Sequence, residues 1–279
     1  MASVRITGED SVFLRDIFEG KGINTARRYA QYDYIINVKY GSFTSIKSSS
    51  NRIDIAMNPN NEILASGLAL ETIITGSGID FQYFPEEKQK KRILIVGCGG
   101  VGSNCCLALS NLDTPFTVID FDRIEEHNAQ SQFLFKKHPG KKKGEVISEY
   151  TKCKFIDGKI EEHTSLLQSH DLILSCVDNW EARMFLSKAT RKLKKKFLNV
   201  SVSAVHASIE YMKSCLQCLY KPEMGKQSCH ETQNLFAMNY IAGALAAEIA
   251  SSNPKSVIVA NNGKRILSYS PEKEVACVC

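Results

Sequence analysis

Three glycines in the segment RILIVGCGGVGSNCC, residues 92–106, have the spacing at which a backbone can hold a nucleotide phosphate. Gly97, Gly99 and Gly102 follow a short apolar run in the pattern G-x-G-x-x-G, with Gly100 between them. Such glycines allow a tight turn, and the start of a following helix offers N–H groups and partial positive charge to a phosphate. NAD, FAD and other nucleotides share this pattern, and a purely structural turn is the alternative. The nucleotide must therefore be identified from other residues.

An acidic residue follows the glycines at the distance expected of a ribose ligand. Asp120 ends the apolar run 116–120, about twenty residues further on, where a carboxylate can accept hydrogen bonds from ribose hydroxyls. Asp122 belongs to the same DFD segment, and we count it with the cofactor-binding residues. Taken alone, these residues still fit an NAD(P)-linked dehydrogenase.

The cysteines suggest a metal site. The chain has ten cysteines, and its first residues, MASVRITGEDS, lack the apolar region of a secretory signal, so we expect a reducing, cytoplasmic location and no disulfides. Cys215 and Cys218 form a C-x-x-C pair, and Cys277 and Cys279 a second close pair. Four such soft ligands suit a closed, tetrahedral structural zinc site. The alternative is a set of unpaired thiols.

A further group of cysteines has an apolar or helical context. They are Cys98, Cys105, Cys106, Cys153 and Cys176. We interpret them as small core residues.

The composition favours no unusual class of protein. Of 279 residues, 43% are hydrophobic and 23% charged, and the net charge is +5. Much of the positive charge lies in the runs 136–143 and 190–196, which lack interleaved aromatic residues, so we expect solvated surfaces and no nucleic-acid partner. The most apolar stretch, 235–250, contains Asn239 and Glu248 and is short for a membrane span. We expect it to be a core helix, with no membrane partner.

The elements that must position these residues alternate regularly from residue 92 onward. We expect strands at 92–96, 116–120, 171–176 and 197–201, and helices at 102–112, near 144–152 and at 180–194. This alternation predicts an α/β fold: a Rossmann-like, doubly wound and mostly parallel sheet. The tail at 256–271 has two strand-like runs around Asn262 and Gly263, which predict a C-terminal hairpin that the zinc site would clip.

The N-terminal third has a different texture, and we expect a small α+β domain over residues 1–84. Its expected elements are helices at 10–22 and 62–76 and strands at 33–43 and 52–57, with the polar segment 44–51 between the strands. Residues 85–91 form a charged connector to the second domain, 92–279.

The ordered motifs after the glycines resemble the adenylating superfamily of ubiquitin-activating enzymes and their bacterial relatives. Those relatives include adenylyltransferases of molybdopterin and thiamine synthesis and of microcin maturation. The resemblance covers residues 92–279 and rests on DFDRIEEHNAQSQFLF (120–135), HPGKKKGEV (138–146) and LILSCVDNWEAR (172–183). It implies that ATP·Mg²⁺ is bound, that AMP is transferred to the C-terminal carboxylate of a peptide or small ubiquitin-like protein, and that the enzyme is a homodimer.

The resemblance also implies roles for single residues. Asp120 would be the ribose ligand, Asn128 a polar contact near the phosphates, Lys143 the phosphate-clamping lysine and Asp178 a magnesium ligand. Lys141 and Lys142 remain alternatives to Lys143, because the loop is one residue shorter than the family pattern. For Lys143 the structural alternative is a solvated lysine.

The helix after Asp178 carries further expectations. Asp178 could instead be the N-cap of that helix. We expect Arg183 to support the helix locally and Trp180 to pack at its start.

One residue departs from the family pattern, and a loop cysteine lies at a position that the family uses. Ser131 stands where relatives have an arginine that contacts the triphosphate, and losing such a cation is not a conservative change. Arg27, Arg28, Lys136 or Lys137 could compensate, and Arg28 is counted as catalytic because the family often borrows an N-terminal arginine from the partner subunit. Cys229 lies where several relatives place a loop cysteine used in covalent steps, with Lys226 and His230 nearby to lower its pKa; an ordinary exposed cysteine is the alternative.

Two functions of different class follow. The first is an adenylating enzyme, and the second, motivated by Ser131, is a non-catalytic partner that recruits an active paralogue or a substrate. The N-terminal third is expected to help grip the substrate. Its run YIINVKY (34–40) could offer a sheet edge to a bound peptide, and a dimerisation or stabilising arm is the alternative.

Overall fold

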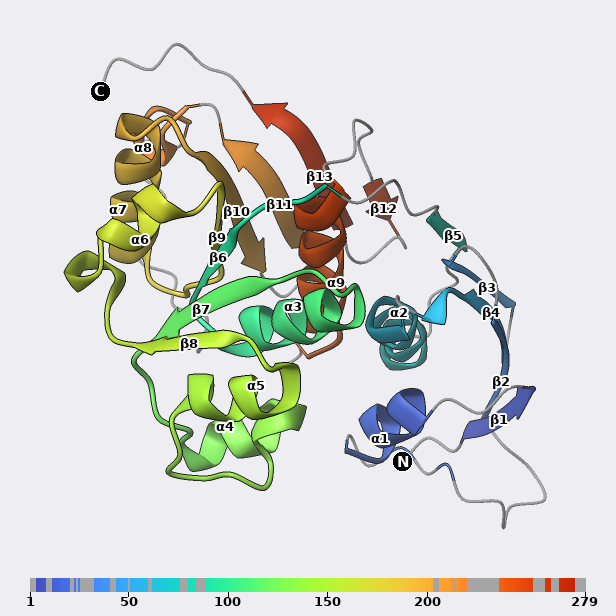
Figure 1. Cartoon of the computed structure of the whole chain (residues 1–279). Coiled ribbons are helices and arrows are strands. Elements are labelled where there is room, and N and C mark those ends of the chain that lie inside the picture. Colours follow the sequence, from blue (N-terminus) through green and yellow to red (C-terminus); the bar gives the residue numbers. More distant parts are fainter. Residues whose placement is uncertain are drawn as a thin grey trace.

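The four apolar residues that precede the glycines form a buried central strand, β6 (Ile93–Val96). The structure is a computed structural model (Figure 1). It describes residues 4–8, 12–20, 23, 25, 33–40, 44–49, 51–59, 62–75, 80–83, 89–202, 206–212, 214–219, 236–252, 259–261 and 266–273.

The larger sheet is built around β6 and has eight strands in the order β12-β13-β11-β10-β9-β6-β7-β8. The strands that join β6 are β7 (Phe116–Asp120), β8 (Lys154–Asp157), β9 (Leu172–Ser175), β10 (Lys196–Val202), β11 (His206–Met212), β12 (Val259–Asn261) and β13 (Ile266–Lys273). From β8 to β10 every neighbouring pair is parallel. β11 runs antiparallel to β10 and β12 antiparallel to β13. The sheet is therefore Rossmann-like in its centre and mixed at one side.

Helices cover both faces of this sheet because its strand residues alternate between two apolar clusters. Ile93 and Ile95 point into one cluster, whereas Leu94 and Val96 point into the other. The first face carries α3 (Gly100–Asn111), α5 (Lys143–Thr151) and α9 (Phe236–Ser252), and the second carries α6 (Ser165–Ser169) and α7 (Trp180–Lys192) (Figure 1). Shorter elements are α4 (Glu126–Ser131), α8 (Leu216–Leu219) and the 3-10 turns Phe133–Phe135 and Ile160–Glu162.

The N-terminal third forms a second, five-stranded sheet with the order β1-β2-β4-β3-β5. Its elements are β1 (Val4–Gly8), α1 (Val12–Gly20), β2 (Tyr34–Tyr40), β3 (Thr44–Ser49), β4 (Arg52–Met57), α2 (Glu62–Thr75) and β5 (Asp80–Tyr83). Alternate residues such as Ile36, Val38 and Ile55 are buried, so one face of the sheet packs on the helices and the other is polar.

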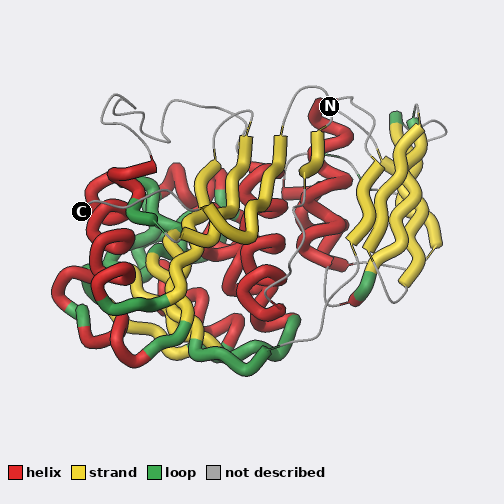
Figure 2. The backbone as a smooth tube through the Cα atoms, turned by 90° about the horizontal axis from the view of Figure 1, so that it is seen from above, coloured by secondary structure: helices red, strands yellow, loops and turns green. Residues whose placement is uncertain are grey.

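The two sheets share a core, which α2 and α9 join. Figure 2 shows the small sheet at one end of the molecule with helices between it and the larger sheet. A Cβ on Gly67 of α2 would lie 2.9 Å from the Cβ of Tyr240 and 3.1 Å from the Cγ1 of Ile241 in α9. The helices touch at this glycine, and the apolar residues of both parts belong to one buried cluster. The division into domains at residues 84 and 92 remains a prediction.

Several expected elements are present within a residue or two of the expected bounds. They include β6, β7, α3, α5, α7 and β10. The stretch predicted as a core helix is α9, with Ala237, Met238 and Tyr240–Ala242 all buried. None of the described helices is long and apolar enough to cross a membrane.

Three expectations about strands are wrong or incomplete. The polar segment 44–51 was expected to separate two strands, but it contains β3. The buried side chain of Ile46 supplies the apolar contact of this strand. The run 34–40 is β2, which pairs with β1 on one side and β4 on the other. It therefore offers no free edge to a peptide. β8 and β11 were not expected.

Candidate functional site

The loops that follow three neighbouring parallel strands meet at one edge of the larger sheet. β7 lies on one side of β6 and β9 on the other, so the strand order reverses at β6. Open α/β sheets bind ligands in the crevice outside the carboxyl ends of their strands at such a reversal. The glycine segment follows β6, Asp120 ends β7 and Asp178 follows β9. The predicted nucleotide residues on these loops therefore share one edge.

The glycines of the loop are required for different local reasons. Gly97 has φ +88°, a conformation that side chains rarely adopt. A Cβ on Gly102 would lie 2.0 Å from the carbonyl oxygen of Gly97, so the turn itself fixes both residues. A Cβ on Gly99 would meet no atom of the described residues within 4 Å. The space beside Gly99 is therefore open to a ligand in the part of the chain that the structure describes.

The carboxylate of Asp120 is buried against this turn. Its Oδ2 accepts a hydrogen bond from the backbone N–H of Cys98 at 2.7 Å, and its Oδ1 accepts one from the N–H of Asp122 at 2.7 Å. Burial raises the pKa of Asp120, against the opposing effect of the two N–H donors and Lys143. A carboxylate has about four acceptor sites, so capacity for ribose hydroxyls remains.

Lys143 lies beside these acids because its loop pairs with the segment after β7. The N–H of Ile124 donates to the carbonyl oxygen of Lys141 at 2.8 Å, and the N–H of Lys143 donates to that of Asp122 at 3.0 Å. The Nζ of Lys143 is 2.8 Å from Oδ2 of Asp122, and only 7% of the residue is exposed. Burial by itself lowers the pKa of Lys143, but the hydrogen bond and attraction to Asp122 outweigh it and raise the pKa. The buried ammonium is therefore charged.

The two rival lysines have other partners. Lys142 donates to the carbonyl oxygen of Phe121 and to Oδ1 of Asp157, both at 2.9 Å. Lys141 pairs with Glu149 at 3.4 Å on the surface. Asp157 lies opposite Asp120 in the sheet, so Lys142 is also close to this carboxylate. Lys143 differs from the other two lysines in pairing with Asp122 and in being buried.

Asn128 is buried, but its side chain makes contacts within its own segment. Its Oδ1 accepts from the N–H of Glu125 at 3.1 Å, and its Nδ2 lies 2.9 Å from Nε2 of His127. Contact with a phosphate would require Asn128 to share these partners, so that role remains a prediction. Ser131 ends the same helix, and its effect on phosphate binding stays a prediction.

Asp178 lies exposed in the loop between β9 and α7. The N-cap of α7 is Asn179, whose Oδ1 accepts from the N–H of Ala182 at 2.7 Å. The alternative interpretation of Asp178 as that cap is therefore wrong. Its carboxylate is left outside the cap, next to the crevice edge.

Arg183 holds the loop that carries Asp178. Its guanidinium donates to Oδ1 of Asn199 at 2.8 Å, to the carbonyl oxygen of Val200 at 2.7 Å and to that of Val177. It thus ties α7 to β10 and to the residue before Asp178, which is more than the local support expected. Trp180, expected to pack at the start of α7, is instead 43% exposed.

The expected zinc site falls only partly on described residues. Cys215 is buried, Cys218 is partly exposed, and the N–H of Cys218 donates to the carbonyl oxygen of Cys215 at 3.1 Å. Cys277, Cys279, Cys229, Arg27 and Arg28 lie outside the described residues. Within the described ranges, no group of three or more His, Cys, Asp or Glu residues could hold a metal ion. The zinc site therefore stays a prediction.

The five cysteines expected in the core lie largely there. Cys98, Cys105, Cys106 and Cys176 are buried, and Cys153 is partly buried. Burial raises the pKa of Cys98, with nearby Asp120 adding to the effect. The thiol of Cys98 is therefore protonated near neutral pH, as thiols of structural cysteines are.

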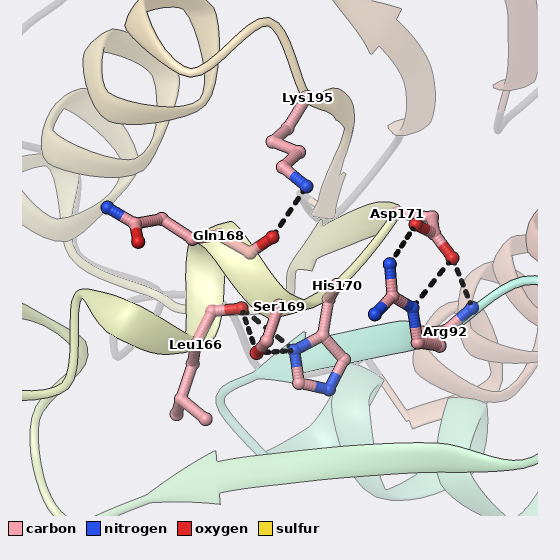
Figure 3. Close-up of polar contacts among 7 residues, drawn as sticks. All are labelled: Arg92, Leu166, Gln168, Ser169, His170, Asp171 and Lys195. Carbon is pink, nitrogen blue, oxygen red and sulfur yellow. Dashed lines mark hydrogen bonds and ion pairs between the residues drawn. The ribbon is translucent and has the colours of Figure 1, made fainter.

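The opposite ends of the strands are closed by a separate polar cluster (Figure 3). Arg92 binds both carboxylate oxygens of Asp171, with its guanidinium at 2.7 and 3.1 Å and its backbone N–H at 3.0 Å. These contacts lower the pKa of Asp171 well below its usual range. Next to it, Nε2 of the buried His170 lies 3.0 Å from the hydroxyl of Thr117. This cluster ties β6, β7 and β9 together and is structural.

The strand order, the two helical layers and the glycine loop define a Rossmann-like α/β protein. The chain belongs to the ThiF family, whose model matches residues 77–252. The solved structure of E. coli MccB with succinimide shares this fold at a TM-score of 0.51 and 18% identity, over 67% of this chain and 66% of that one. The family prediction made from the motifs is therefore confirmed.

Curated relatives include enzymes that activate ubiquitin-like proteins. Ubiquitin-like modifier-activating enzyme 5 of Aedes aegypti is 28% identical over 204 residues, covering 62% of this chain and 47% of that protein. Adenylyltransferase and sulfurtransferase uba4 of Neosartorya fischeri is 31% identical over 112 residues, covering 39% of this chain and 23% of that protein. The chain thus spans about half or less of the length of these relatives.

One polar residue near the glycine loop has no role in the motifs. Asn239, in the first turns of α9, packs directly against Gly100. The sequence signal for it is weak: a single amide in a helical stretch that is otherwise apolar up to Glu248.

Proposed function

We propose that the chain adenylates the C-terminal carboxylate of a peptide or of a small ubiquitin-like carrier protein. A carboxylate oxygen attacks the α-phosphorus of ATP, the bond from that phosphorus to the bridging oxygen breaks, and pyrophosphate leaves. The observation that carries the proposal is the buried, charged Lys143 beside Asp120 and Asp122, at the carboxyl ends of the strands of a ThiF-family fold. Because two anions must meet, such a cation lowers the barrier by stabilising charge in the transition state.

In this proposal each loop of the crevice has one task. The open space beside Gly99 admits the phosphate chain, Asp120 accepts hydrogen bonds from the ribose, and Lys143 moves from Asp122 toward the phosphates. Asp178 would hold Mg²⁺, for which an exposed carboxylate is a suitable ligand. Arg183 would keep Asp178 in place through its bond to Val177.

Zinc would have a structural task. Cys215 and Cys218 lie one turn apart around α8 and could supply two thiolate ligands, with Cys277 and Cys279 as the other two. Such a site would tie the chain end to the segment after β11 and contribute directly to folding.

The N-terminal sheet is proposed to help recognise the substrate. Lys47 and Arg52 on its polar face are exposed. Strand addition would have to use β1 or β5, the edge strands of the described sheet, since β2 is paired on both sides. Cys229 as a nucleophile and Arg28 as a cation from a homodimeric partner belong to this same proposal.

A pyrophosphate-exchange assay with candidate carrier peptides tests the enzyme. Exchange of labelled pyrophosphate into ATP should require Mg²⁺ and a peptide with a free C-terminus, and the same peptide with an amidated C-terminus is the matched control. Equal exchange with the amidated peptide would exclude adenylation of the terminal carboxylate.

Ser131 favours a second candidate, a non-catalytic partner of an active paralogue. That candidate predicts binding of a second adenylating subunit, no exchange by the chain alone, and no gain from Ser131→Arg unless the partner is added. If NAD binds while ATP does not, both candidates fail and a dehydrogenase must be considered.

A further inference from the structure

Asn239 brings an amide group from α9 to the start of α3. A Cβ on Gly100 would lie 2.5 Å from Nδ2 of Asn239 and 3.1 Å from its Cγ. Gly100 therefore lacks a side chain because the Asn239 amide occupies that place. This differs from Gly99, beside which the described residues leave open space.

The packing of α9 on α3 sets this position. A Cβ on Gly243 would lie 2.6 Å from the carbonyl oxygen of Val101 and 2.8 Å from the Cβ of Asn104, so the two helices touch there. Residues four apart share a helix face, which places Asn239 on the same face as Gly243. Asn239 lies about one turn before Gly243 in α9. Its contact, Gly100, lies about one turn before Asn104, the contact of Gly243, in α3. The two helices therefore begin at the same end, the crevice end.

The side-chain amide of Asn239 has no hydrogen-bond partner among the described residues, and its neighbours in α9 are apolar. Ala237, Met238, Tyr240 and Ile241 beside it are buried, whereas Asn239 is partly exposed. Buried amide groups are normally hydrogen-bonded, so the part of this amide that packs against Gly100 needs a partner from water or from a ligand. The neighbouring carbonyl oxygen of Gly100 already accepts from Nδ2 of Asn104 at 2.7 Å.

The backbone next to the amide is also rich in unused donors. The N–H of Ser103 donates to the carbonyl oxygen of Gly99 at 3.0 Å and makes the first bond of the helix. The N–H groups before it have no carbonyl partner within the helix. Side-chain and backbone donors thus meet next to the open space beside Gly99, and such a group of donors suits an anion.

We propose that Asn239 is a further binding residue of the nucleotide site, donating from its amide to the phosphate chain at the start of α3. The inference rests on the proposed function, because it needs ATP in this crevice. Asn239 would supply a hydrogen-bond donor from α9 to the phosphates. These are the phosphates that lack the family's usual arginine, because Ser131 stands at its position.

Titration of the full-length protein with Mg·ATP, Mg·ADP and adenosine tests this inference. Asn239→Ala should weaken binding of Mg·ATP and Mg·ADP by roughly tenfold, the usual worth of a hydrogen bond to a charged group, and should leave adenosine binding unchanged. Asn239→Asp has nearly the same shape but cannot donate and adds a negative charge. It should therefore weaken nucleotide binding more than Asn239→Ala does. Asn111→Ala, at the exposed far end of α3, is the matched control.

The outcomes separate the possible explanations. If Asn239→Ala binds Mg·ATP as tightly as the unchanged protein, the inference is wrong. It is also wrong if Asn239→Asp keeps full affinity and raises Tm, since the residue would then be capping α3. If the unchanged protein fails to bind Mg·ATP, the proposed function fails and this inference with it. Should both variants fold poorly, Asn239→Gln, which keeps the amide on a longer stem, must retain more affinity than Asn239→Ser for the inference to stand.

Discussion

The side chain of Lys143 lies 2.8 Å from the carboxylate of Asp122, while its backbone N–H donates to the carbonyl oxygen of the same residue at 3.0 Å. The cation is thus fixed twice to one position next to Asp120. A lysine on a surface loop would lose much side-chain entropy on binding a phosphate, whereas Lys143 is already ordered. In the proposed function, Asp122 would hold Lys143 until the more highly charged triphosphate binds.

Replacing Lys143 should remove catalysis while largely preserving the fold. We expect Lys143→Met to lower the rate of pyrophosphate exchange by about 100-fold or more, as losing a transition-state donor does. The lost ion pair leaves no buried charge behind, because the Asp122 side chain is 46% exposed. Lys141→Met is the matched control, since Lys141 pairs only with Glu149 at the surface. Equal losses in both variants would contradict the assignment.

The ion pair of Arg92 and Asp171 should make the stability of the fold depend on pH in the acidic range. The pKa of Asp171 is lowered in the folded protein, so the pair stabilises the fold above the unfolded value of 3.8 and loses this effect as pH falls toward the folded value. The difference in Tm between the unchanged protein and Asp171→Asn should therefore shrink below about pH 4. The effect should be small because both side chains are exposed. Glu149→Gln, at a longer surface pair, should show less of it.

Alanine substitutions at Gly99 and Gly102 should affect nucleotide binding and stability separately. Gly99→Ala should leave the free energy of unfolding nearly unchanged, since no described atom lies within 4 Å of the new methyl group. It should nevertheless weaken Mg·ATP binding, because that methyl group fills the proposed phosphate path. Gly102→Ala would place a Cβ 2.0 Å from a backbone oxygen and should cost about 3 kcal/mol of stability. Chemical denaturation and nucleotide titration measure the two effects, and a stable Gly102→Ala variant would contradict this account.

Gly100 and Asn239 should be energetically coupled. Gly100→Ala alone should destabilise the protein by about 1–3 kcal/mol, because its Cβ would meet the Asn239 amide at 2.5 Å. In the double variant with Asn239→Ala the amide is gone, and most of this cost should disappear. A double-mutant cycle by chemical denaturation measures the coupling. Additive effects would show that Gly100 is required for another reason.

Zinc content tests the cysteine site. The purified protein should hold about one zinc ion per chain, and Cys218→Ser should lower both the metal content and Tm. Cys153→Ser is the control, because Cys153 lies in none of the proposed ligand pairs. Metal analysis that finds no zinc in the unchanged protein would remove this site from the proposal.

The strands and helices of the crevice were predictable because each carries a local signal. Continuous apolar runs mark β6 and β7, and the glycines mark the turn into α3. Contacts between distant segments carry no such signal. Nothing local says that Asn239 will meet Gly100, that Arg183 will reach Val200, or that Lys142 will turn to Asp157 while its neighbour turns to Asp122.

The pairing of the strands could also not be predicted from the sequence. The run 34–40 reads as a strand, but its position between β1 and β4 follows from which other strands pack on α1 and α2. The segment 44–51 was misread for a related reason. Ser45, Lys47 and Ser49 face the polar side of the sheet, where they give no apolar pattern, and pairing with β4 and β5 fixes the segment as a strand.

The place of α9 in the chain has a consequence for biosynthesis. The helix packs against α3 and α2, yet it begins 136 residues after the start of α3 and 174 residues after the start of α2, counting from 100, 62 and 236. Until α9 has been synthesised, the faces of α2 and α3 that pack against it lack this cover. Folding must therefore wait for long-range contacts, which slows it and exposes intermediates to aggregation. Among the described elements, α9 thus determines when the edge of the larger sheet that carries the glycine loop and the N-terminal sheet can become stable together.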